Sequence, residues 1–156
     1  MYRSAIIVLM GVLPVASIAI DFLARHGDAD LRLLIGKWFV FWAVGVRLIL
    51  AGARQLTGPS FAAETIFGVR DKAALPIVQE LGMGNLSIGL LGALALVHAG
   101  WIVPAAIAGT LFYGLAGINH LLRSGRNAHQ NMAMVSDLIA FVVLAGYLAA
   151  VSLEPR

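Results

Sequence analysis

Apolar residues in this chain gather into five long runs, and the short stretches between the runs hold most of the charged residues. Each run is about 20 residues long, which is the length an α-helix needs to cross roughly 30 Å of hydrocarbon. Strands of a membrane barrel would alternate in polarity over about 10 residues, and these runs do not alternate. The pattern predicts five transmembrane helices, over residues 4–24, 36–56, 76–97, 103–122 and 131–152.

Composition supports a membrane protein. Apolar residues make up 60% of the 156 positions and charged residues only 12%, and a soluble domain of this size could not bury so much apolar surface. We therefore expect an all-α integral membrane bundle in one domain, without room for a separate catalytic domain. Cysteine is absent, which excludes disulfides, iron–sulfur clusters and cysteine nucleophiles.

The distribution of charge predicts the topology. We call the side that holds the connections around residues 57–75 and 122–131 the first side, and the opposite side the second side. The first side carries six Lys and Arg residues and the second side four, Arg156 included, so the positive-inside rule favours a cytoplasmic N-terminus and an external C-terminus in an inner membrane. The basic residues stand singly at the ends of apolar runs, which argues against nucleic-acid binding.

Two segments admit more than one interpretation. The first run resembles a signal peptide, because Arg3 precedes the apolar stretch and residues 16–19 are small, but we expect it to be retained as a helix. In the connection 57–75, Pro59 and Ser60 can start a short helix with one apolar face. That helix would either lie along the membrane surface or cover the first-side end of the bundle.

Charged side chains inside spans cost roughly 2.5–3.5 kcal/mol each on insertion scales, so they usually face a partner or a cavity. Arg47, Glu80 and Asp137 lie well inside the predicted spans. At 1.5 Å per residue, these three lie about 13, 6 and 9 Å from the first-side ends of their helices. Other polar residues of the same half are Arg54, Asn85, Tyr113, Asn119 and His120.

We therefore predict a polar cluster that faces the cytoplasm, in which Arg47 pairs with Asp137 or Glu80 and the uncharged groups complete the hydrogen bonding. The alternative is that these residues only hold the helices together and bind no ligand. The same acidic groups and His120 could also form a proton relay.

No catalytic or metal site is predicted. His120 is the one histidine near the interior of a span, so a haem site is disfavoured. The chain has no His-Glu-x-x-His, no Gly-x-Ser-x-Gly and no phosphate-binding loop. An autonomous enzyme is accordingly disfavoured.

Several segments resemble known membrane families. Residues 47–52, Phe61 and the run 80–92, which opens Glu-Leu-Gly-Met-Gly-Asn, are similar to the DoxX-like membrane proteins. Residues 112–120, Phe-Tyr-Gly-Leu-Ala-Gly-Ile-Asn-His, and the later Asp137 resemble more closely a bacterial group known as a domain of unknown function. The resemblance covers roughly residues 36–147.

The DoxX-like resemblance implies a four-helix bundle, here preceded by one extra helix, that acts as a small subunit beside a quinone-linked oxidoreductase. By position it singles out Arg47, Glu80 and Arg54. This chain has Arg54-Gln55 where that family often has Lys after the Gly, and it carries no cofactor motif of its own.

Three functions follow, in order of preference. The first is a non-catalytic subunit or binding module for a quinone-like or other small amphipathic molecule, whose partners are the lipid bilayer and a membrane oxidoreductase or further copies of the chain. The second is a small transporter or proton-coupled channel. The third is a purely structural subunit of a larger membrane complex.

Overall fold

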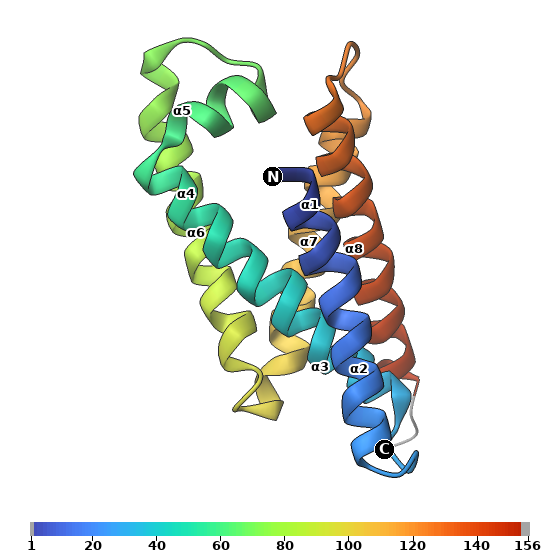
Figure 1. The fold of residues 1–156 in the computed structure, drawn as a ribbon. Coiled ribbons are helices and arrows are strands. Elements are labelled where there is room, and N and C mark those ends of the chain that lie inside the picture. The colour runs from blue at the N-terminus through green and yellow to red at the C-terminus, as the bar shows by residue number, and fades with distance from the viewer. Residues whose placement is uncertain (1, 154–156) are drawn as a thin grey trace.

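The computed structural model describes residues 2–153, and every regular element in that range is a helix (Figure 1). Continuous segments join into five helices that are long and apolar enough to cross a membrane. The all-α, five-helix prediction is therefore confirmed. The segments are α1 (Tyr2–Ile7), η1 (Val8–Val12), α2 (Leu13–Ala24), α3 (Leu31–Phe39), η2 (Val40–Val46), α4 (Arg47–Thr57), α5 (Pro59–Phe61), η3 (Ala62–Phe67), η4 (Lys72–Ala74), α6 (Leu75–Leu94), η5 (Ala99–Trp101), α7 (Ile102–Leu121) and α8 (Ala128–Ser152).

Two helices begin earlier than the apolar pattern indicates, because polar caps start them. Asp30 accepts the backbone N–H of Arg32, so α3 begins at Leu31, five residues before position 36. The Arg32 guanidinium also bonds the Asp30 carboxylate and holds the pKa of that carboxyl below its usual range. Helix α8 begins at Ala128 for a similar reason, since Asn127 and Gln130 form a capping box. Arg156, counted on the second side, lies outside the described residues.

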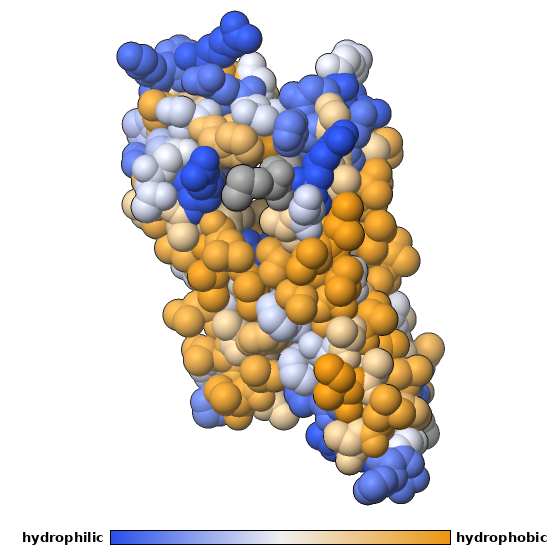
Figure 2. Space-filling model, viewed as in Figure 1, coloured by the Kyte–Doolittle hydropathy of each residue, from blue (hydrophilic) through white to orange (hydrophobic). Residues whose placement is uncertain are grey.

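The surface has the character of a protein in lipid. Ile20, Leu115 and Val142 are 68%, 69% and 65% exposed, whereas large apolar side chains of a soluble protein are mostly buried. Figure 2 shows apolar residues covering the middle of one face, with hydrophilic residues gathered at its two ends. This arrangement agrees with a multi-pass membrane protein.

The helices pack as two pairs that separate toward the first side (Figure 1). Glycines allow α4 to lie directly on α6: a Cβ atom on Gly52 would stand 2.6 Å from the carbonyl oxygen of Gly82. Helices α7 and α8 form the other pair, in which Gly114 packs on Phe141 and Gly117 on Leu138. Small residues at such contacts are typical of membrane helix packing.

One long helix connects the two pairs. It packs against α2 and α8 through α3, runs through η2, and then packs against α6 through α4; Figure 1 shows it crossing the molecule diagonally. Its middle part, η2, is a π-helix, and Val40, Ala43 and Val44 are fully buried there. This helix therefore contacts both pairs, α8 through α3 and α6 through η2 and α4.

The connection after α4 is also helical. Segments α5 and η3 together span residues 59–67, which we call the connecting helix. Its Ala62 and Ala63 pack with Val78 in a small core of their own. Gly68 ends the connecting helix at φ 72°, a left-handed conformation that favours glycine.

Candidate functional site

The centre of the candidate site is an ion pair between the two helix pairs. The Nη2 atom of Arg47, at the start of α4, lies 2.7 Å from Oδ1 of Asp137 on α8 and 3.2 Å from Oγ of Ser136. The Arg47 and Asp137 side chains are only 13% and 7% exposed. The sequence predicted that Arg47 pairs with Asp137 or Glu80, and in the structure its partner is Asp137.

An aromatic ring supports the guanidinium. The Cζ atom of Arg47 stands 4.9 Å from the ring centroid of Tyr113 on α7, within cation–π range. The Tyr113 hydroxyl donates to the carbonyl oxygen of Ala43 in η2. In a regular α-helix that carbonyl would accept from Arg47, but the Arg47 N–H donates to the carbonyls of Trp42 and Val44 instead. The π-helix therefore lets the backbone contribute an acceptor to the site, a known use of such segments.

His120 lies beside this cluster and is incompletely satisfied. The contacts of Gly114 with Phe141 and of Gly117 with Leu138 give α7 and α8 a register that sets His120 level with residue 135. It is thus about 3 Å, two residues of helix rise, from the level of Asp137. His120 is 6% exposed, and its Nδ1 atom has no hydrogen-bond partner among the residues that the structure describes. Such a buried, unpaired atom costs about 1–3 kcal/mol unless a water or ligand bonds it.

Asn85 belongs to a second, separate polar contact. Its Nδ2 donates to Oε1 of Gln55 over 2.7 Å, between α6 and α4. Both side chains are buried, and the Asn85 Oδ1 atom has no partner within residues 2–153. Gln55 was not among the predicted site residues, although its position one helical turn beyond Ala51 and next to Arg54 was visible in the sequence.

Besides Asn85, three further predicted members do not converge on Arg47. Glu80 and Asn119 are exposed on the outer faces of α6 and α7, and neither forms an ion pair or hydrogen bond with the described residues through its side chain. Arg54 is exposed too and stands 5.3 Å over the Phe61 ring. Depth alone suggested that these groups meet, but the rotation of each helix about its axis turns them away.

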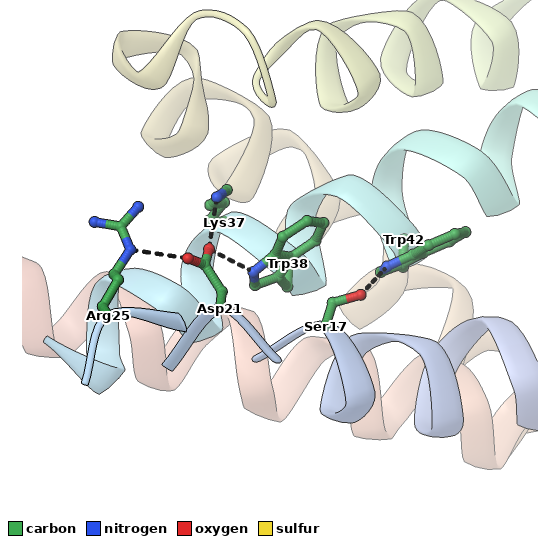
Figure 3. A network of polar contacts seen from close by, with 6 residues as sticks. All are labelled: Ser17, Asp21, Arg25, Lys37, Trp38 and Trp42. Atoms are coloured by element: carbon green, nitrogen blue, oxygen red, sulfur yellow. Dashed lines mark hydrogen bonds and ion pairs between the residues drawn. The ribbon is translucent and has the colours of Figure 1, made fainter. Parts of the chain in front are cut away.

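A second polar network, which sequence reasoning did not predict, lies near the second side (Figure 3). Asp21 on α2 accepts from Lys37, Arg25 and Trp38 over 2.7, 2.8 and 3.1 Å. Between the same two helices, the Trp42 indole donates to the Ser17 hydroxyl over 2.9 Å. The signal that could have paired these residues is one acidic residue near the end of an apolar run, followed by a Lys-Trp pair at the start of the next run. We call these six residues the second-side network.

Two hollows on the surface lie away from the ion pair. One, of about 370 Å³, is open and borders the second-side network at Asp21, Lys37 and Trp38. The other, of about 290 Å³, lies between α3 and α8 and includes Arg32 and Tyr147. Arg47, His120 and Asp137 line neither hollow. Among residues 2–153, no three His, Asp or Glu side chains gather closely enough to hold a metal ion.

The comparisons with known proteins place the chain in a family. Residues 4–154 match the family described as "family of unknown function (DUF6790)", so the chain belongs to that family. The match supports the resemblance to an uncharacterised domain family and gives no support to the DoxX-like resemblance. No curated protein and no solved structure matches the chain.

Proposed function

For this member of a family of unknown function, we propose a binding role in an inner membrane, with the N-terminus in the cytoplasm. The protein binds a small amphipathic molecule of the quinone type, with the polar head beside the Arg47–Asp137 ion pair and the apolar tail among the helices. It has no catalytic role of its own and serves a membrane oxidoreductase as an accessory subunit.

One observation carries this proposal: the buried Nδ1 atom of His120 lacks a partner next to a buried ion pair. A quinone carbonyl accepts hydrogen bonds, and the imidazole N–H supplies one where no protein group does. Apolar walls with a few convergent polar groups suit such a ligand. Leu48, which follows Arg47 in α4, is a buried apolar residue.

Transport is less well supported by the same geometry. A transporter requires a polar route from the ion pair to the second side. The core on that side of Arg47 is apolar and includes Val40, Val44 and Leu144, whose exposures are all 0%. A purely structural role accounts for the ion pair but leaves the unpaired His120 nitrogen unexplained.

The experiment uses the protein purified in a mild detergent. We expect native mass spectrometry to show a bound molecule of quinone mass and the absorption spectrum to show its chromophore. After delipidation, decylubiquinone should raise the free energy of unfolding, by about 2.7 kcal/mol when its concentration is 100 times the dissociation constant.

A matched pair of variants locates the binding. His120→Leu should abolish the stabilisation by decylubiquinone, whereas His98→Leu, an exposed histidine near the second side, should leave it unchanged. Equal stabilisation of both variants, or none in the parent protein, would remove the proposal.

A further inference from the structure

The connecting helix ends against the opposite helix pair. It follows α4 in the chain and packs on Val78 of α6, yet its last three carbonyl oxygens accept hydrogen bonds from the α7–α8 connection and the start of α8. Those C-terminal carbonyls have no partner within their own helix and need one. The bonds are Asn127 Nδ2 to Thr65 O at 3.1 Å, Gln130 Nε2 to Ile66 O at 3.1 Å and Arg123 Nη1 to Phe67 O at 3.3 Å.

These bonds lie nearer the first side than the ion pair does. Gln130 and Asp137 are seven residues apart on α8, so they share one face and are about 10 Å apart along the axis. Arg47 and Arg54 have the same spacing on α4, and Arg54 stands over Phe61 of the connecting helix. The two helix pairs are thus tied together at two levels, by the ion pair and, two turns nearer the first side, by the connecting helix.

The two amide side chains that hold the connecting helix perform a second task. Asn127 Oδ1 accepts the backbone N–H groups of His129 and Gln130, and Gln130 Oε1 accepts the backbone N–H of Asn127. Their oxygen atoms cap α8, and their nitrogen atoms bond the connecting helix. An Asp or Glu at these positions would retain the first function and lose the second.

We infer that the connecting helix is a lid over the Arg47–Asp137 ion pair, and that Asn127 and Gln130 hold it closed. This rests on the proposed function in so far as the covered site binds a ligand. Release of these two bonds leaves, of the three, the 3.3 Å bond from Arg123 to Phe67 O, which is the longest, and so lets the first-side route between α4 and α8 open. The lid remains attached to the other pair through Ala62, Ala63 and Val78.

The double variant Asn127→Asp/Gln130→Glu tests the lid without disturbing α8. Both acidic residues cap a helix N-terminus well, and negative charge is favourable there. The same charges repel the carbonyl oxygens of the connecting helix, which they can no longer bond. Asn131→Asp is the matched control, because it adds a carboxylate on the same turn and retains the acceptor that bonds Arg126.

The access of a water-soluble reagent to the ion pair is measured with a single introduced thiol, since the chain contains no cysteine. Ser136→Cys places the thiol next to Arg47, and a sulfonated methanethiosulfonate, which does not enter lipid, is the probe. We expect the double variant to react about thirtyfold faster than the Ser136→Cys parent, because two hydrogen bonds are lost and each contributes a factor of about five. The Asn131→Asp control should react at the parent rate.

Hydrogen exchange gives an independent readout that does not depend on Ser136. The Val69 N–H bonds the carbonyl of Ala63 at 2.8 Å, and amides of residues 64–69 should exchange faster in the double variant only. Unchanged labelling and unchanged exchange would overturn the lid. Because neither measurement uses a ligand, faster labelling in a protein that binds no decylubiquinone would retain the lid and remove the proposed function.

Discussion

Asp21 and Asp137 are both carboxylates within apolar helices, and their surroundings differ in three respects. Asp21 lies about 5 Å from the second-side end of α2, whereas Asp137 lies about 14 Å inside α8. Asp21 has three donors that are 4, 16 and 17 residues away in the chain, but the donor to Asp137 is 90 residues away. The second-side network leaves none of its buried side-chain atoms unsatisfied, whereas His120 beside Asp137 has an unpaired nitrogen.

The contrast separates an anchor from a candidate site. Tryptophan and lysine near a membrane boundary stabilise the position of a helix in the bilayer, and Asp21 pairs such residues of α3 with α2. The Arg47–Asp137 ion pair is deeper, so its desolvation cost is higher, and such a cost is usually tolerated for function or specificity. Three substitutions test this comparison.

The largest effect is expected for Arg47→Leu. It leaves the Asp137 carboxylate buried without its cation, and breaking a buried pair in this way costs about 3–5 kcal/mol. We expect Asp137→Asn in the same chain to restore part of the loss, because the stranded charge is then removed. Unfolding by SDS in mixed micelles, followed by circular dichroism, measures both.

The control for that loss comes from the second-side network. Arg25→Leu removes one partner of Asp21. The Arg25 side chain is 58% exposed, so we expect the free energy of unfolding to fall by less than about 1 kcal/mol. Equal losses for Arg25→Leu and Arg47→Leu would contradict the distinction between anchor and site.

An intermediate effect is expected for Tyr113→Phe. The ring beneath Arg47 is retained, but the Ala43 carbonyl loses the hydroxyl that bonds it. A buried acceptor left unsatisfied costs about 1–3 kcal/mol. Tyr147→Phe is the comparison, since the Tyr147 hydroxyl forms no hydrogen bond with the described residues, and stability in the same assay should barely change. A Tyr113→Phe protein as stable as Tyr147→Phe would show that the π-helix carbonyl does not depend on the hydroxyl.

The smallest effect is expected for Asp21→Asn. The amide oxygen still accepts from Lys37, and the pair lies near the aqueous boundary, so the loss should be below about 1 kcal/mol. Trp38 fluorescence reports the local change, because its indole donates to the same carboxylate. Asp28→Asn, in the exposed loop, should shift neither stability nor emission. A loss for Asp21→Asn as large as that for Arg47→Leu would place the second-side network in the same class as the ion pair.

The sequence predicted the cluster in part. Insertion cost singled out Arg47 and Asp137 as groups that require partners, and helix rise gave them similar depths. The choice between Asp137 and Glu80 required the rotation of α6 and α8 about their axes, which periodicity in these almost uniformly apolar helices does not define. Ser136 and Gln55 were missed because the sequence does not show which of the many uncharged polar residues in the spans face a neighbouring helix; Asn119, which was chosen, faces outward.

The connecting helix, too, was predicted from the sequence only in part. Its start at Pro59 and its apolar face were predicted, and a covering position was one of two open interpretations. The bonds from Asn127 and Gln130 to its last carbonyls join residues that are 62 and 64 positions apart in the chain. Local helix rules describe a capping box at Asn127 but not a second use for its amide nitrogen.

The sequence by itself determined that this protein lies in a lipid bilayer and that its fold is all-α. Runs of about 20 apolar residues can satisfy their backbone in lipid only as helices, and charges in such runs stand out because they are costly. Only the tertiary structure decided which charges meet. Partners in a bundle are fixed by how closely glycines let helices approach and by the rotation of each helix about its axis, and these are properties of pairs of helices, which no single run encodes.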